Sequence, residues 1–349
     1  MEKAKFVLSK RVLSSQLRKL EDMGFKISYS YKTNHVVGNV LEEINEGVSF
    51  SVHSFHEVDE IKDKSRIHFF CQAETEKEFE KLLALGISSF VVDNEEDLET
   101  LLRVVANKNH KVNLGLRMKF QEHRVGSGKY FVYGMSARKV NDLIILHKEN
   151  KSIKEIGIHI HRKSQNTSEW DILGELKDSI KEEVLELIDF VNFGGGLPSL
   201  YKSSTEKVFD YIFKKLKEAK EWLENRGIVS IIEPGRFLAA PSIKLITKII
   251  QKQKHILIIN TSIYNCGLDT LLTGTKMLVE GELEEEEDGI NYLIKGNSPT
   301  RDDIFRYRVR LKEKNVGDEI VFLNAGAYNY STDFFGYEKL DTEILEDFL

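Results

Sequence analysis

The sequence predicts an α/β protein in which a (β/α)8 barrel of the TIM type is followed by a mostly antiparallel β domain. Short apolar runs alternate with amphipathic segments about eight times over roughly 210 residues, which is the size and rhythm of such a barrel. After residue 240, strand-like segments follow one another without long helices, and the length of 349 residues suits a barrel with an appended domain. We expect a barrel over 24–240, and a β domain made of 1–23, as an N-terminal strand and helix, and 241–349.

The predicted barrel strands are short runs rich in β-branched and aromatic residues, whereas the predicted helices repeat apolar residues every three or four positions. The strands are expected at 26–34, 48–54, 67–72, 88–94, 112–120, 153–162, 189–196 and 229–236. The clearest helices are expected at 76–86, 95–105, 136–150 and 205–227. Gly47, Gly86 and Gly227 stand where helices should end.

The β domain is predicted from five further apolar segments, at 242–251, 255–263, 291–297, 305–312 and 319–328. The acidic run at 281–290 is expected to form an exposed hairpin loop between two of them rather than a metal site. Residues 6–9 predict an additional short strand, which could pair with either domain.

Composition excludes several classes of protein. Lys and Arg total 50 against 56 Asp and Glu, so the net charge is −6, and no clustered basic face predicts nucleic-acid binding. No apolar stretch approaches the roughly 20 residues that cross a membrane, and no secretory signal is evident at the start. Cys71 and Cys266 form no CxxC or Cys/His spacing, so neither a disulfide framework nor a cysteine-rich zinc site is predicted. We expect a cytoplasmic protein that binds neither nucleic acid nor membranes.

Reactive side chains stand at the carboxyl ends of several predicted barrel strands, where barrel enzymes place their chemistry. Lys32 ends the first strand, although a lysine there is commonly a surface residue that extends to solvent. His159 and His161 end the sixth strand two positions apart, so both would lie on one face. The alternative is one core histidine and one exposed histidine.

The last two barrel strands end in groups that suit a phosphate. The seventh is followed by Gly194, Gly195 and Gly196, whose backbone N–H groups could face an anion, and the eighth by Glu233 and Arg236. The loops after strands seven and eight are the usual phosphate site of such barrels. A lysine that can form a Schiff base, a phosphate cradle and an acid for a ring nitrogen together predict pyridoxal 5′-phosphate (PLP).

The motifs carrying these residues resemble those of the PLP-dependent barrel-fold (fold type III) amino-acid decarboxylases. That family includes the ornithine, lysine, diaminopimelate, arginine and carboxynorspermidine decarboxylases, and the resemblance covers roughly residues 5–337. The motifs, in family order, are YKTN, HIHRKSQ, NFGGGLP, EPGRFLAA and NAGAYNYSTDFFGY.

The resemblance implies a role for each matching residue. Lys32 matches the Schiff-base lysine and a catalytic group, and His161 matches the catalytic histidine that stacks on the pyridine ring. Glu233 matches the carboxylate bonded to the pyridine nitrogen, and Arg117 matches an arginine near that ring. The remaining cofactor contacts are implied for Ser164, Gly194, Gly195, Gly196, Gly235, Arg236 and Tyr328. The family also implies a homodimer whose active sites are shared between subunits.

The segment 296–305, GNSPTRDDIF, departs from the family pattern. It keeps Asp303 but has Pro299 where the family has a cysteine, and Thr300 where an acid binds the distal amine of the substrate. Arg301 stands beside it and, if buried or half-buried, could bind a carboxylate through two hydrogen bonds. The alternative is that Arg301 points to solvent or pairs with Asp302 or Asp303. We therefore assign Thr300, Arg301 and Asp303 to the substrate, and expect a substrate with a second acidic group. Ser51 also replaces a common aspartate.

These features together predict a PLP-dependent carboxy-lyase. It would remove CO2 from an amino acid or an amino-acid-derived substrate, in amino-acid metabolism or polyamine biosynthesis. An amino-acid racemase or epimerase of the same fold is the first alternative, although the resemblance places an acid, not an arginine, at the ring nitrogen. A non-catalytic relative of the decarboxylases is the second.

Overall fold

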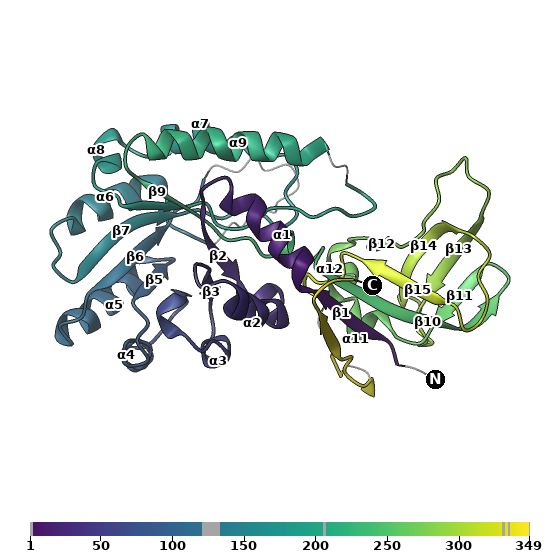
Figure 1. Ribbon diagram of the computed structural model, residues 1–349. Coiled ribbons are helices and arrows are strands. Elements are labelled where there is room, and N and C mark those ends of the chain that lie inside the picture. The colour runs from purple at the N-terminus through teal and green to yellow at the C-terminus, as the bar shows by residue number, and fades with distance from the viewer. Residues whose placement is uncertain (1–2, 121–132, 205–206, 330–331, 334–335, 349) are drawn as a thin grey trace. The chain divides into compact units, whose positions relative to one another are not determined.

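The computed structural model describes residues 3–120, 133–204, 207–329, 332–333 and 336–348, and its elements are labelled in Figure 1. The chain forms two compact units. The barrel unit comprises Leu20–Leu197 and Lys207–Pro234. The β unit comprises Met1–Lys19, Pro198–Glu206 and Gly235–Leu349. The segment Pro198–Glu206, which comes soon after the triple glycine, therefore belongs to the β unit rather than to the barrel.

Eight parallel strands close into a barrel, as the sequence predicts. Each strand pairs in parallel with the next, and the last returns to the first through the register Lys26↔Ile231. The strands are β2 (Lys26–Ser30), β3 (Ser49–Val52), β4 (Ile67–Phe70), β5 (Ser89–Val92), β6 (Val112–Arg117), β7 (Ile153–His159), β8 (Phe190–Asn192) and β9 (Val229–Ile232). They end earlier than predicted, because the polar residues that follow them lie in turns.

Side chains alternate between the two faces of the barrel strands. Phe69 of β4 and Phe90 of β5 contact the helix layer, through Phe55 and Phe79 at centroid distances of 6.1 and 6.0 Å. Ser51 of β3, next to a buried phenylalanine in sequence, instead bonds to the glutamate that follows β9. The barrel interior is therefore partly polar, whereas the outer face of the strands is aromatic.

The four helices expected from periodicity are confirmed, within one to three residues at most ends. They are α4 (Glu76–Ala84), α5 (Glu95–Asn107), α6 (Ala137–His147) and α9 (Lys207–Glu224); positions 205 and 206 of the last expectation lie outside the described residues. Other helices of the barrel unit were not predicted. These are α2 (His35–Ile44), α3 (Phe55–Glu60), α7 (Ile172–Ser179) and α8 (Glu182–Leu185), with the 3-10 turns η1 (Tyr31–Thr33) and η2 (Lys64–Arg66).

The β unit is a sheet of mixed direction, in which five of the seven described strand pairs are antiparallel. Its N-terminal strand pairs within this unit and leads into the helix α1 (Lys10–Glu21). The strands are β1 (Lys5–Ser9), β10 (Ile243–Gln253), β11 (Ile256–Ile259), β12 (Leu278–Val279), β13 (Ile290–Lys295), β14 (Ile304–Leu311), β15 (Glu319–Leu323) and β16 (Thr342–Leu345). The hairpin expected around 281–290 is wrong, because β11 and β13 pair in parallel and β12 pairs with β15.

Neither cysteine of the chain forms a disulfide, and both are buried. Burial raises the pKa of the Cys266 thiol to about 12 and that of the Cys71 thiol well above its ordinary value, so both stay protonated. No helix within the described residues has the length and apolar character that crossing a membrane demands.

A buried ion pair in the β unit joins the short helices α10 (Arg236–Ala239) and α12 (Leu268–Thr273). Arg236 donates two parallel hydrogen bonds to Asp269, over 2.6 and 2.8 Å, and a third to the Tyr201 hydroxyl over 2.9 Å. Both charged side chains are only 3% exposed. Although burial opposes the charge on Arg236, its hydrogen bonds to Asp269 raise the pKa of this group.

We expect the Asp269→Ala substitution to lower the free energy of unfolding by about 3–5 kcal/mol, because it leaves a buried guanidinium without its carboxylate. Urea unfolding followed by circular dichroism measures the change. The matched control is Glu280→Ala, which removes a half-exposed partner of Lys244 and should cost at most about 1 kcal/mol. Equal losses in the two variants would contradict the structural importance of the buried pair.

Candidate active site

Five side chains or backbone groups chosen from the sequence lie at the carboxyl ends of barrel strands. Lys32 is in η1, directly after β2, and Arg117 is the last residue of β6. His161 and Gly194 each follow by two residues the ends of β7 and β8, and Glu233 comes directly after β9. Because the carboxyl ends of parallel strands share one rim of a barrel, these groups gather at that rim.

The Glu233 carboxylate is buried, with 6% of its side chain exposed, and accepts hydrogen bonds from three strands. Its Oε1 accepts from Ser51 Oγ and from Asn192 Nδ2, each over 2.8 Å. Its Oε2 lies 3.2 Å from His159 Nε2. The backbone N–H of Glu233 also donates to the Gly194 carbonyl over 2.9 Å, which ties β9 to the glycine loop.

These contacts keep Glu233 ionised. Burial opposes the charge, but the neighbouring His159 and the hydrogen bond from Ser51 outweigh it and lower the pKa of Glu233 to about 2. A carboxylate offers about four acceptor positions, and the described contacts occupy three of them. The fourth, on Oε2, suits one further N–H donor. A protonated aromatic nitrogen is such a donor and would also neutralise the buried negative charge.

His161 is held as a neutral imidazole. Burial, assisted by the positive charges of Arg117 and Lys32, lowers the pKa of His161 to about 3. Its Nδ1 accepts a hydrogen bond from the Gly195 N–H over 3.4 Å, so the ring proton lies on Nε2. The rings of His159 and His161 are nearly parallel, at 21° and 6.3 Å between centroids. Both histidines thus face the same side, as their spacing predicts. They differ in their partners, because His159 contacts Glu233, whereas His161 accepts a hydrogen bond from Gly195.

Arg117 is fixed by Asp93, the residue that follows β5, with 3.3 Å between its Nη1 and the Asp93 Oδ1. Its side chain is 19% exposed, so the guanidinium is mostly sheltered. Lys32 is exposed at the start of the rim, and its charge acts on His161. The two cations therefore stand on the same side of the barrel as the buried carboxylate.

The triple glycine is packed too closely for any side chain at its first position. Gly194 has φ +65°, and a Cβ atom there would lie 2.0 Å from the Ile160 carbonyl oxygen. Of the three N–H groups that we expected to face a phosphate, that of Gly194 donates to Asn192 and that of Gly195 to His161. The N–H of Gly196 has no acceptor within the described residues. The loop therefore presents one backbone donor to a ligand, not three.

The sequence motifs indicate Glu233 but not the three residues that contact its carboxylate, which are Ser51, Asn192 and His159. The available signal was a polar residue inside an otherwise apolar strand, at positions that face the barrel interior. In the sequence, Ser51 stands out only because it replaces the aspartate that is common at this position in the family. Its hydrogen bond to Glu233 explains why a short hydroxyl side chain suits that position.

His159, His161 and Glu233 also bring three ligand atoms within 4.8 Å of one another, which is close enough for a metal ion. The carboxylate, however, is already held by the neutral donors of Ser51 and Asn192. We therefore interpret the cluster as a place for an organic cation rather than for a metal.

The other expected cofactor contacts lie outside this cluster. Ser164 is exposed in the loop after β7. Gly235 precedes α10 in the β unit, and Arg236 follows it in the ion pair with Asp269. Tyr328, also in the β unit, has the left-handed φ of +57° and places its ring 5.1 Å from the Arg236 guanidinium carbon. The motif that contains Tyr328 continues through 330–331 and 334–335, which lie outside the described residues.

The structure corrects part of the substrate assignment. Asp303 is fully buried, and its carboxylate accepts hydrogen bonds from Ser262 Oγ and from the backbone N–H groups of Ile263 and Ser298. The expectation that it contacts substrate is wrong, because its acceptors are used to hold the turn before α11 (Ile263–Cys266). The Thr300 hydroxyl bonds to that of Ser298 over 2.7 Å. Arg301 is 93% exposed and its Nε lies 3.4 Å from Asp302 Oδ1, so in this chain it adopts the alternative arrangement, a surface pair.

Comparison with known proteins identifies the family. The profile described as "Pyridoxal-dependent decarboxylase, pyridoxal binding domain" matches residues 10–240. The diaminopimelate decarboxylase of Pseudomonas aeruginosa is 26% identical over 271 residues, which are 70% of this chain and 63% of the relative. The carboxynorspermidine/carboxyspermidine decarboxylase of Campylobacter jejuni is 26% identical over 266 residues, 69% of this chain and 65% of the relative. The chain thus spans somewhat less than two thirds of the length of these curated relatives.

The fold has close counterparts among solved structures. The lysine/ornithine decarboxylase of Vibrio vulnificus, complexed with cadaverine, superposes with a TM-score of 0.79 at 22% identity, over 98% of this chain and 94% of that one. The profile match covers well over half of the chain and confirms both the family and the cofactor class expected from the motifs. This chain belongs to the family of pyridoxal-dependent decarboxylases.

Proposed function

We propose that this protein is a PLP-dependent carboxy-lyase that removes CO2 from the α-carbon of an amino acid or an amino-acid-derived substrate. The observation that carries the proposal is the buried, ionised Glu233 with one acceptor position left at the rim of the barrel. Glu233 follows β9, and Lys32 follows β2, the strand that pairs with β9, so the two groups suit the ring nitrogen and the aldehyde of a single cofactor.

When bound, PLP draws electrons from the substrate α-carbon, so that the carboxyl group can leave as CO2. In this proposal Glu233 holds a proton on the ring nitrogen, which strengthens that withdrawal. Lys32 would supply the amine that anchors the cofactor through its aldehyde. His161, being neutral, covers the ring as a flat imidazole and does not act as a strong proton donor.

The phosphate of the cofactor has fewer protein donors than the motifs suggested. The N–H of Gly196 is the donor in the glycine loop that suits it. Ser164 is exposed in the loop after β7, whose Asn166 N–H donates to the Gly196 carbonyl. Roles for Gly235, Arg236 and Tyr328 remain part of the proposal. The left-handed backbone of Tyr328 supports it, since a bulky residue with positive φ is strained and such strain concentrates at functional sites.

Two further points of the proposal concern assembly and substrate. We propose a homodimer in which residues of the β unit complete the site of the partner subunit. A substrate with a second acidic group would then meet Arg301 from that partner, since this guanidinium is exposed on its own chain. The racemase and non-catalytic alternatives are less well supported, because the residue proposed for the ring nitrogen, Glu233, is an ionised carboxylate and Lys32 is retained.

Reduction with borohydride should fix the cofactor to Lys32, because only an amine joined to the aldehyde is trapped. We expect peptide mapping of reduced wild-type protein to find the label on Lys32, and Lys32→Ala protein to lose CO2 release by more than about 1,000-fold. Lys26→Ala, at the opposite end of β2, is the matched control and should keep both label and activity. A label on another lysine would overturn the assignment.

The lowered pKa of Glu233 predicts a pH-dependent stability. Because the folded-state value of about 2 lies below the ordinary 4.5, the carboxylate stabilises the fold above pH 4.5. This contribution, on the order of 3 kcal/mol, is lost as pH falls from about 4.5 to 2. We expect the unfolding free energy of wild type to fall more steeply over this range than that of Glu233→Gln. Parallel slopes for the two proteins would show that Glu233 ionises normally.

Substrate preference tests the role of Arg301. On diaminopimelate, which carries a second carboxylate, Arg301→Ala should lower kcat/KM by about 10- to 100-fold, as expected for a lost charge-assisted contact. On ornithine or lysine, which have no second carboxylate, the same variant should change little. Equal small effects on both kinds of substrate would make Arg301 a surface residue without a role in selection.

A further inference from the structure

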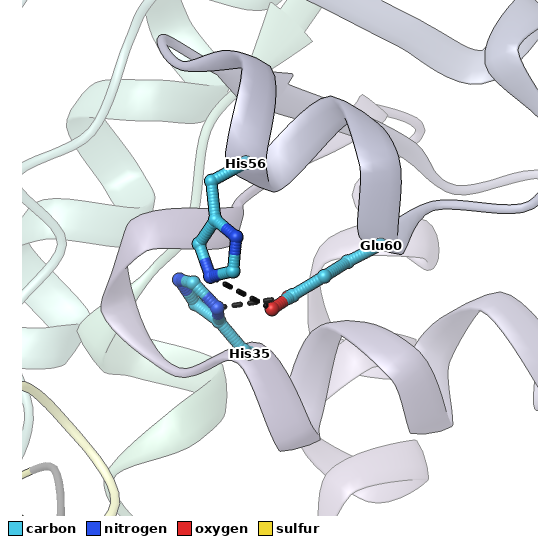
Figure 2. A group of neighbouring side chains, drawn as sticks. All are labelled: His35, His56 and Glu60. Atoms are coloured by element: carbon cyan, nitrogen blue, oxygen red, sulfur yellow. Dashed lines mark ion pairs between the residues drawn. The ribbon is translucent and has the colours of Figure 1, made fainter.

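A second group of possible metal ligands lies outside the candidate active site, between two helices of the barrel unit. It consists of His35, His56 and Glu60, which we call the His/Glu cluster. His35 is the first residue of α2, whereas His56 and Glu60 lie one turn apart on α3. Figure 2 shows both imidazole rings turned toward the end of the Glu60 side chain.

The distances in the cluster suit a small cation. His35 Nδ1 lies 2.8 Å from Glu60 Oε2, and His56 Nε2 lies 3.2 Å from Glu60 Oε1. One ligand atom from each residue falls within 4.8 Å of the other two. Metal–ligand bonds of about 2.0–2.2 Å in tetrahedral geometry place ligand atoms roughly 3.3–3.5 Å apart. Small rotations of three side chains would therefore bring all of them to bonding distance.

An outer layer of polar groups orients the cluster. The buried carboxylate of Glu57 lies 3.9 Å from His35 Nε2, the ring nitrogen that does not face Glu60. Glu57 is itself held by the side chain and the backbone N–H of His53, over 2.9 and 2.8 Å. Tyr31 donates to Glu60 Oε2 over 3.0 Å. Histidines that bind metals commonly direct their second nitrogen to a carboxylate, which fixes the ring and strengthens the ligand.

We infer that the His/Glu cluster binds a divalent transition-metal ion such as Zn2+, through His35 Nδ1, His56 Nε2 and the Glu60 carboxylate. Two imidazoles with one carboxylate favour such ions over Mg2+ and Ca2+, which prefer oxygen ligands. The His56 side chain is 78% exposed, so an ion can enter from solvent and keep a water molecule as its fourth ligand.

The site would link the helices after two neighbouring barrel strands. His35 follows η1, the turn that carries Lys32, and the buried Tyr31 ring of that turn packs against the His35 ring at 4.9 Å. A bound ion would hold α2 to α3 and thereby steady this turn. The sequence alone does not indicate this site, because the three ligands come from two separate segments and neither segment by itself has a distinctive ligand spacing.

Zinc binding by the tag-free, PLP-loaded full chain tests the inference directly. We expect equilibrium dialysis to show that the wild type binds Zn2+, and that His56→Ala and Glu60→Gln each lower the affinity for Zn2+. Loss of an outer-layer partner alone costs roughly 10- to 100-fold in metal affinity, so loss of a ligand should cost at least as much. The matched control is His110→Ala, which removes an exposed histidine of the same unit and should bind as wild type does. Because His56 is exposed, its loss should not impair folding.

Visible absorption with Co2+ provides a second readout that reports the ligands themselves. Wild type and His110→Ala should show the same cobalt bands, and His56→Ala should lack them. Two results would overturn the inference: no binding of Zn2+ to wild type at micromolar concentration, or equal binding by wild type and His56→Ala. The second result would place the ion elsewhere, for instance at His159, His161 and Glu233. Neither result bears on the proposed decarboxylation, which does not need this metal.

Discussion

The ionised carboxylate of Glu233 is the interaction on which the candidate site depends. A buried carboxylate is stable only when donors replace the water that it loses, and here the donors come from β3, β7 and β8. Each donor strand must therefore end in the correct register beside β9. The closed parallel barrel supplies that register, since it brings the carboxyl ends of all of its strands to one rim.

A second buried charge organises the β unit in a different way. Arg236 donates hydrogen bonds to Asp269 and Tyr201, which belong to the same unit. The pair stabilises the short helices α10 and α12, for which the sequence carries no strong helical pattern. The two buried charges thus differ in function: Glu233 keeps an acceptor position open, whereas Arg236 is held by a bidentate partner.

The sequence was sufficient for the barrel and for the groups at its strand ends, because strands and long helices are encoded by local periodicity. It did not reveal α3, whose six residues are too few to repeat an apolar stripe, or α2, although the caps Asn34 and Ser54 stand in the sequence before both helices. It also misjudged Asp303, whose chemistry suits a substrate but whose side chain is used to hold a turn. Which acid serves structure and which serves chemistry depends on tertiary contacts, and a linear motif does not contain them.

The central claim is that Glu233 keeps the ring nitrogen of bound PLP protonated. Nitrogen NMR of the protein loaded with PLP that carries 15N in the ring measures this directly. Wild type should give the shift of a protonated pyridine nitrogen near neutral pH, and Glu233→Gln should give that of an unprotonated one. Identical shifts in the two proteins would contradict the account, because the carboxylate would then not control the ring nitrogen.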